Sequence, residues 1–209
     1  MISKRLLTAV SFLKGRNVID VGADHGELEL YLTKHDLVDK VLAIENKVGP
    51  YNRLVNAVNN EPKVIPLLSD GLKDITSDIT SAFLLGMGGE LIISIIEKDF
   101  DKLASVEQFV VDAHRDTDKV RTYLTNHGYK IEKEAIVFEK GIYYFVISFI
   151  KGTQVLSESE TLFGYKTYLD PLWSQYKSYE LARLTALYEK SHNKKIQNKI
   201  RRLLSNEHD

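Results

Sequence analysis

The chain has 209 residues, of which 44% are hydrophobic, and its 28 basic and 29 acidic residues give a formal net charge of −1. It contains no cysteine, which excludes disulfides, thiolate nucleophiles and cysteine-ligated zinc. No stretch approaches the roughly 18 apolar residues of a membrane span, and Lys4, Arg5 and Lys14 interrupt the apolar residues that a signal peptide needs. We therefore expect a cytoplasmic protein with no membrane partner, formed by one domain and an appendage.

Residues 1–152 alternate between short apolar strands and amphipathic helices. The periodicity predicts a helix over 3–13, capped by Ser3, and then strands and helices that follow one another along the chain. The predicted strands are 17–21, 41–44, 64–68, 81–85, 108–112, 129–138 and 142–150, and the helices between them are 26–35, 49–60, 90–96 and 117–127. This order predicts an α/β fold with a Rossmann-like, doubly wound sheet of seven mostly parallel strands. The final hairpin is typical of class I methyltransferases.

The composition changes after Gly152, and we predict a second, α-helical domain over residues 153–209. Asp170-Pro171 is a good start for a helix that reaches about Lys190. A turn at 191–193 and a shorter helix follow, which together predict an antiparallel, coiled-coil-like hairpin. Apolar residues in a heptad rhythm are expected to join its two helices: Leu169, Leu172, Tyr176 and Tyr179.

The stretch from Lys190 to Arg202 contains six basic residues and no acid. Such a run is either a binding surface for an anionic partner or a solvated helix face. The residues concerned in the second helix are Lys194, Lys195, Lys199, Arg201 and Arg202.

The first predicted strand ends in an acidic, glycine-containing turn. Its pattern is Asp20-x-Gly22-x-Asp24-x-Gly26, which differs from the dinucleotide fingerprint G-x-G-x-x-G. Small residues in such a turn allow a ligand to approach the backbone, and the helix that follows presents unpaired N–H groups. Because two acids suit a cation better than a pyrophosphate, the turn favours the sulfonium and ammonium groups of S-adenosylmethionine (SAM).

Three further strand ends carry residues that match other parts of SAM. Glu45, with Asn46 beside it, can accept the ribose hydroxyls, and Asp70, followed by Gly71, can accept the adenine amine. Gly86, Met87 and Gly88 form a loop that allows close approach of the carboxypropyl chain or the substrate base. Any one of these acids alone is an ordinary turn residue or helix cap. Their occurrence at four successive strand ends predicts a SAM site.

Several short motifs resemble the bacterial tRNA (adenine-22-N1)-methyltransferase family (TrmK), in order and spacing over nearly the whole chain. They are Ser3-Lys-Arg-Leu6, Asp20-Val-Gly-Ala-Asp-His25, Gly49-Pro50, Asp70-Gly-Leu72 and Gly86-Met-Gly-Gly89. The resemblance implies an enzyme that transfers a methyl group from SAM to N1 of adenine 22 in the D-arm of tRNA. It also implies tRNA as partner, with Arg5 and the tail cations as candidate contacts.

The chain departs from this family after its fifth strand. Asp112-Ala-His-Arg-Asp116 stands where the family shows Gln with Pro or Asn, so the substrate contact expected there is replaced by Asp112, His114 or Arg115, or is absent.

Methyl transfer to a ring nitrogen needs positioning more than acid–base chemistry. Asp24 is the candidate catalytic residue, because a carboxylate near the reacting base could stabilise the cationic product; the alternative is that Asp24 only binds the cofactor. We expect no metal and a monomer. Two other functions stay open: a SAM-dependent methyltransferase of a protein or small molecule, and a non-catalytic RNA-binding module.

Overall fold

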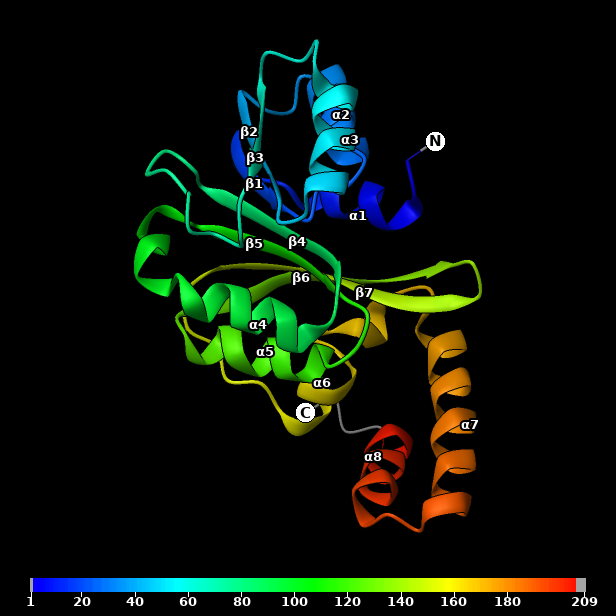
Figure 1. Ribbon diagram of the computed structural model, residues 1–209. Coiled ribbons are helices and arrows are strands. Elements are labelled where there is room, and N and C mark those ends of the chain that lie inside the picture. The colour runs from blue at the N-terminus through cyan, green and yellow to red at the C-terminus, as the bar shows by residue number, and fades with distance from the viewer. Residues whose placement is uncertain (1, 206–209) are drawn as a thin grey trace.

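In the computed structural model, which describes residues 2–205, the chain begins with alternating helices and strands (Figure 1). The strands are β1 (Asn17–Val21), β2 (Lys40–Glu45), β3 (Val64–Leu68), β4 (Ser81–Met87), β5 (Gln108–Ala113), β6 (Tyr129–Glu139) and β7 (Ile142–Lys151). The helices among them are α1 (Lys4–Phe12), α2 (Glu27–Lys34), α3 (Val48–Val58), α4 (Gly89–Lys98), the 3-10 helix η1 (Phe100–Ser105) and α5 (Thr117–Asn126). Ser3 caps α1 as predicted, since its hydroxyl accepts a hydrogen bond from the Leu6 N–H at 3.2 Å.

The seven strands form one sheet in the order β3-β2-β1-β4-β5-β7-β6. Only β7 runs antiparallel to its neighbours, which confirms the predicted mostly parallel, Rossmann-like sheet. The strand order reverses between β1 and β4, whose register pairs Val21 with Leu84. In sheets of this kind, ligands bind beyond the carboxyl ends of the strands at that reversal.

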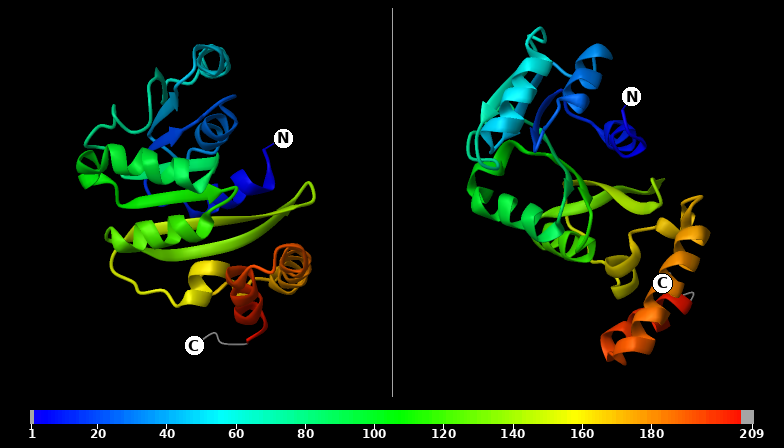
Figure 2. Two further views of the ribbon diagram at one scale, coloured as in Figure 1. Left: turned by 60° about the horizontal axis from the view of Figure 1, so that its bottom comes forward. Right: turned by 45° about the vertical axis from the view of Figure 1, so that its right-hand side comes forward.

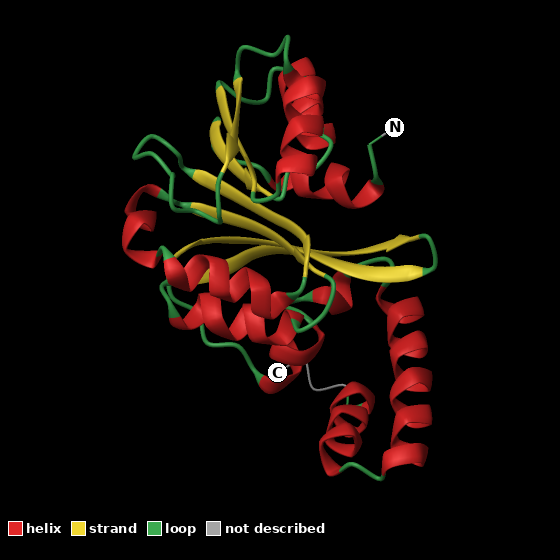
Figure 3. Ribbon diagram, viewed as in Figure 1, coloured by secondary structure: helices red, strands yellow, loops and turns green. Residues whose placement is uncertain are grey.

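Helices cover both faces of the sheet (Figures 1 and 3). On one face α1, α2 and α3 bury apolar side chains such as Ala9, Leu28 and Leu54. On the other face α4 and α5 bury Ile92 and Val120. The sheet is therefore buried on both sides, which leaves the strand ends as the place where polar side chains can meet a ligand.

Beyond β7 the chain continues as α6 (Glu158–Phe163), the 3-10 helix η2 (Thr167–Leu169), α7 (Trp173–Ser191) and α8 (Lys194–Leu204). Figure 2 shows α7 and α8 side by side at one end of the molecule, as the predicted hairpin requires. Helix α6 was not predicted. It begins with a capping box, in which the Ser157 hydroxyl accepts from the Glu160 N–H while the Glu160 carboxylate accepts from the Ser157 N–H.

The prediction that the apolar heptad residues join the two helices of the hairpin was wrong, because the face of α7 that carries them packs against β7. Tyr176, 7% exposed, packs edge-on against Phe145 of β7 at 4.9 Å between ring centroids, and Tyr143 lies 5.2 Å from Tyr179. Leu169 is 69% exposed. The heptad rhythm marks a single apolar face, and in α7 that face meets the β6–β7 hairpin. The residues that join α7 to α8 and α6 are Phe163, Leu181, Leu184, Ile196, Ile200 and Leu203.

Helix α7 also begins two residues later than predicted, at Trp173 in place of Pro171. The Asp170 carboxylate accepts hydrogen bonds from the Leu172 N–H at 2.8 Å and from the Ile136 N–H at 2.9 Å. It therefore ties the turn before the helix to β6 instead of capping a helix that starts at Pro171.

Candidate functional site

The turn after β1 has an open backbone surface. Gly22 and Gly26 have φ angles of 84° and 72°, in the left-handed region that glycine adopts at little cost. A Cβ at Gly22 would meet only the Met87 methyl carbon, at 3.8 Å. Two N–H groups of the turn, those of Gly22 and Ala23, donate to the Ile44 carbonyl at 2.9 and 3.2 Å. The turn is thus fixed to β2 while its outer surface remains accessible to a ligand.

Glu45 connects the end of β2 to this turn. Its Oε1 accepts a hydrogen bond from the Asp24 N–H at 2.7 Å, and the side chain is 8% exposed. This contact brings two of the predicted acids together and stabilises the left-handed conformation of Asp24, whose φ is 43°. One oxygen of Glu45 supports the turn, and the other is the group that could accept a ligand hydroxyl.

The Asp24 carboxylate lies on the surface of the site, with about half of the side chain exposed. Arg53 of α3 donates to its Oδ1 at 3.1 Å, and His25 Nε2 lies 3.4 Å from its Oδ2. Asp24 is therefore ion-paired in this structure, and a ligand contact with its carboxylate would compete with Arg53.

The end of β3 places Asp70 beside residues from two other elements. Lys98 of α4 donates to Asp70 Oδ2 at 2.6 Å, and this hydrogen bond together with the lysine charge lowers the pKa of the Asp70 carboxyl. The Asn46 amide, which follows β2, contributes in the same direction. Asp70 is consequently an ionised acceptor, in a position next to the residues that follow β2.

The glycines after β4 serve two different purposes. Gly86 has a φ of 75°, and a Cβ there would lie 3.8 Å from side-chain nitrogens of Arg5 and His114. A Cβ at Gly89 would lie only 2.5 Å from the Asp116 carbonyl oxygen, so no other residue fits without a backbone shift. Gly89 is thus required for packing against the loop after β5, whereas Gly86 and Met87 lie at the end of β4, beside the point where the strand order reverses.

A charged cluster occupies the end of β5. Arg5 of α1 forms a short ion pair with the Asp112 carboxylate, lies 3.0 Å from His114 Nε2, and stacks over the Tyr144 ring at 4.6 Å. Asp112 is 1% exposed, and burial raises the pKa of its carboxyl. Its Oδ1 has no hydrogen-bond partner among the described residues. Arg5 is therefore held at the end of β5 by Asp112, and the predicted contact of Arg5 with RNA phosphate would compete with this ion pair.

The sequence analysis missed one acid at this site. Glu29 of α2 is fully buried and lies within hydrogen-bonding reach of Asp20, which is 5% exposed. The sequence pattern does not reveal that Glu29 lies near Asp20 and Glu45, because an acid in the first turn of a helix is common and usually exposed.

The tail cations do not form one uniform outward face. Lys194, Lys195 and Arg201 are exposed, as expected. Lys199 lies 3.9 Å from the Asp118 carboxylate of α5, and Arg202 forms a short ion pair with Glu158 of α6. These two side chains are 42% and 41% exposed, so both ion pairs lie at the surface, and the five-residue phosphate surface stays a prediction.

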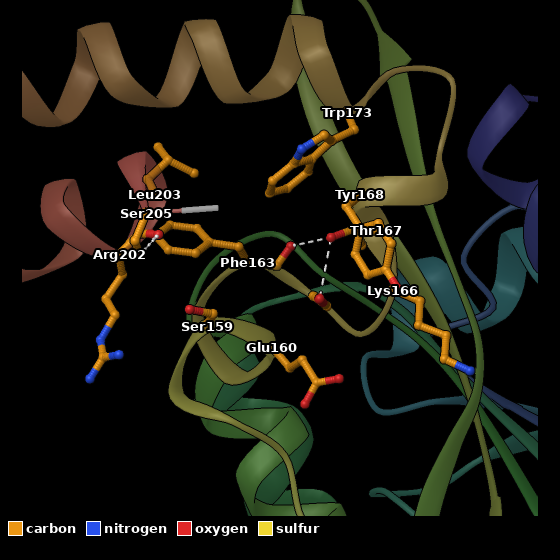
Figure 4. Close-up of a pocket in the computed structure, with 11 residues that line it drawn as sticks. Ser159, Glu160, Phe163, Lys166, Thr167, Tyr168, Trp173, Arg202, Leu203 and Ser205 are labelled. Carbon is orange, nitrogen blue, oxygen red and sulfur yellow. Dashed lines mark hydrogen bonds between the residues drawn. The ribbon is translucent and has the colours of Figure 1, made fainter. Parts of the chain in front are cut away.

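A cavity lies apart from the strand ends, where α8 meets α6 and η2 (Figure 4). Phe163, Trp173 and Leu203 provide its apolar walls, and Thr167 is held inside by hydrogen bonds from its hydroxyl to the Phe163 and Gly164 carbonyls. The chain leaves α8 at this cavity, so it belongs to the packing of the tail.

Residues 2–205 contain no cluster of three or more histidine and acidic side chains arranged to hold a metal ion. Within the same residues, no helix is both long enough and apolar enough to cross a membrane.

Comparison with known proteins gives one family match. A family model described as a methyltransferase domain matches residues 2–147. No curated protein sequence matches the chain significantly.

Several solved structures are similar over almost their whole length. Two are of Streptococcus pneumoniae Sp1610, a candidate tRNA (m1A22) methyltransferase. Its complex with SAM has a TM-score of 0.89 and 30% sequence identity, and a second structure has 0.90 and 29%; both cover 97% of this chain and 98% of the other. The structure of M. capricolum TrmK with S-adenosyl-homocysteine, at 23% identity, has the same fold, with a TM-score of 0.86 and coverage of 97% and 96%.

Proposed function

Since this chain belongs to the methyltransferase family that includes the tRNA (m1A22) methyltransferases, we propose that it transfers a methyl group from SAM to N1 of adenine 22 in tRNA. The observation that carries the proposal is the convergence of Asp20, Glu45 and Asp70 at one edge of the sheet, in a chain similar over 97% of its length to a protein crystallised with SAM. A non-catalytic RNA-binding role would not require this set of acids.

We assign the cofactor contacts from the position of each acceptor. Glu45 accepts the ribose hydroxyls with the oxygen that does not hold the Asp24 N–H, and Asp70 accepts the adenine amine. Asp20 provides negative charge beneath the ammonium group, while the open surface of Gly22 allows the cofactor to contact the backbone. Gly86 and Met87 approach the cofactor from the end of β4, the strand next to β1. These residues fit the cationic, hydrogen-bond-donating surface of SAM.

When bound, SAM supplies the electrophilic methyl group. The residues of this chain have to orient the base and exclude competing nucleophiles, because N1 of adenine attacks with a lone pair and carries no proton to remove. N1 faces the pairing partner in structured RNA, so the base must be exposed before it reacts. Asp112 is the buried acceptor at the end of β5 where an exposed base would arrive.

Asp24 retains two alternative roles. Its exposed carboxylate could stabilise the positive charge of N1-methyladenine, or it could contribute only to cofactor binding. The ion pair with Arg53 bears on both roles, since a contact of the carboxylate with the base or with the cofactor would compete with the arginine. Catalysis through Asp24 would then require Arg53 to move when the base arrives.

Three exposed cations of α8 are our first candidates for contacts with RNA phosphates: Lys194, Lys195 and Arg201. On the same helix, Lys199 pairs with Asp118 of α5 and Arg202 pairs with Glu158 of α6, so a phosphate contact by either would compete with an acid. A monomeric state and a cytoplasmic location remain predictions of the sequence.

The test uses labelled SAM and two unmodified tRNA transcripts that differ only at position 22, one with adenine and one with guanine. We expect label in the first transcript alone, and nuclease digestion should release it as N1-methyladenosine. Label in both transcripts, or release as N6-methyladenosine, would contradict the proposal.

A further inference from the structure

The acid that the sequence analysis missed is buried in an unusual way. Glu29 has no exposed surface, and neither of its carboxylate oxygens accepts a hydrogen bond from any donor in the described part of the chain. An ionised carboxylate without partners is strongly unfavourable in such a place. A buried, unpartnered carboxyl group is therefore expected to hold a proton.

The neighbours of Glu29 are acids. Asp20 of β1 lies within hydrogen-bonding reach, and Glu45 of β2 is the next charged group that acts on the pair. In the turn, the Asp24 carboxylate lies 3.4 Å from His25 Nε2 and pairs with Arg53 from α3. No basic side chain forms an ion pair with Asp20 or Glu29 within residues 2–205, so a proton is the only positive charge available to the pair.

Two carboxyl groups that face each other are stable when one is protonated and donates to the other. Glu29 is the deeper of the two, at 0% exposed against 5% for Asp20, so the proton belongs on Glu29. Burial raises the pKa of Glu29 well above its usual range, and it raises the pKa of Asp20 to about 6, an increase that the hydrogen bond from Glu29 limits.

We propose that Glu29 is a positioning residue of the cofactor site: its protonated carboxyl donates a hydrogen bond to the Asp20 carboxylate, which keeps Asp20 ionised and oriented toward the ammonium group of SAM. This inference rests on the proposed cofactor contact of Asp20. It has a consequence for binding, because protonation of Asp20 removes the negative charge that the cation needs. SAM affinity should fall below about pH 6, by up to about tenfold for each pH unit.

The experiment measures SAM affinity by calorimetry between pH 5 and pH 8.5 for the wild type, Glu29→Gln and Glu29→Leu. Glutamine keeps a hydrogen-bond donor and carries no charge. The SAM affinity of this variant should therefore stay within about twofold of the wild type, and the pH midpoint of its loss of affinity within a few tenths of a pH unit. Leucine removes the donor. The pH midpoint for loss of SAM affinity should then rise by about one pH unit, so that below this pH the leucine variant binds SAM about tenfold more weakly than the wild type.

A second measurement does not depend on the folding of the leucine variant. Infrared spectroscopy of the wild type at pH 7.5 should show the band of a protonated carboxylic acid that is absent in Glu29→Gln. The proposal is overturned if that band is missing, if Glu29→Leu has the wild-type pH profile, or if glutamine weakens binding as much as leucine. Failure of the proposed function gives a different result, namely a wild type that does not bind SAM at any pH.

Discussion

A buried ion pair is one of the contacts that attach the helical tail to the sheet. Arg121 of α5 and Glu134 of β6 are 1% and 0% exposed in their side chains, and the guanidinium donates to Glu134 Oε1 at 3.0 Å and 2.5 Å. The same arginine donates to the Thr161 carbonyl at 2.8 Å, while Glu134 Oε2 accepts from the Tyr165 N–H at 2.8 Å. The pair therefore connects α5 and β6 to the segment that follows α6.

Replacement of Arg121 with methionine removes the charge but keeps most of the side-chain volume. Glu134 would remain buried with only the Tyr165 N–H as donor, and an uncompensated buried charge of this kind costs about 3–5 kcal/mol in the free energy of unfolding. The matched control is Arg16→Met, which removes an arginine from a surface ion pair with Asp39. The two side chains are 49% and 59% exposed, so this loss should be small beside that of Arg121→Met.

Urea unfolding provides the assay, and the chain contains a suitable local probe. Its single tryptophan, Trp173, lies at the start of α7 in the tail. In Arg121→Met the tryptophan fluorescence transition should occur at lower urea than the loss of far-ultraviolet circular dichroism, since the tail loses its attachment first. A double variant, Arg121→Met with Glu134→Leu, should recover part of the loss because no buried charge remains. Equal losses of stability in Arg121→Met and Arg16→Met would contradict this prediction.

Three further predictions concern the site. Glu45→Ala should weaken SAM binding by about 1.5–3 kcal/mol by removing charge-assisted hydrogen bonds, and unchanged affinity in a folded variant would remove Glu45 from the cofactor site. Asp24→Ala should lower the single-turnover rate at saturating SAM if the carboxylate acts on the base; a reduced affinity with an unchanged rate would make it a cofactor ligand only. Substitution of Lys194, Lys195 and Arg201 with glutamine should weaken tRNA binding and reduce its salt slope by about 0.9 per lost duplex phosphate contact, with SAM affinity retained, whereas identical slopes would show a solvated face.

Much of the fold could be predicted from periodicity. Short apolar strands and amphipathic helices in alternation indicate a parallel sheet, and the position of each strand end follows from the residue at which the apolar run stops. Glu45 and Asp70 were found in this way. Their meeting at one edge of the sheet follows from topology, since all parallel strands end on the same side.

The remaining features depend on contacts between distant parts of the chain, which a pattern does not contain. Tyr176 belongs to a heptad pattern of apolar residues, but the pattern does not show which element this face of the helix packs against. In the fold Tyr176 packs against Phe145 of β7, not against α8. The sequence likewise does not show that Arg5 forms an ion pair with Asp112, because this contact depends on how α1 packs against the end of β5. Helix α6 is different, because the Ser157–Glu160 capping box was present in the sequence and was overlooked.

A crystal structure of the protein with S-adenosylhomocysteine would show whether the acidic ends of β1, β2 and β3 form the cofactor site. We predict that the ribose hydroxyls lie against the Glu45 carboxylate, the adenine amine against Asp70, and the ammonium group above Asp20 and Gly22. A cofactor bound elsewhere, for example in the cavity lined by Phe163 and Trp173, or one that makes no contact with these three acids, would contradict the account.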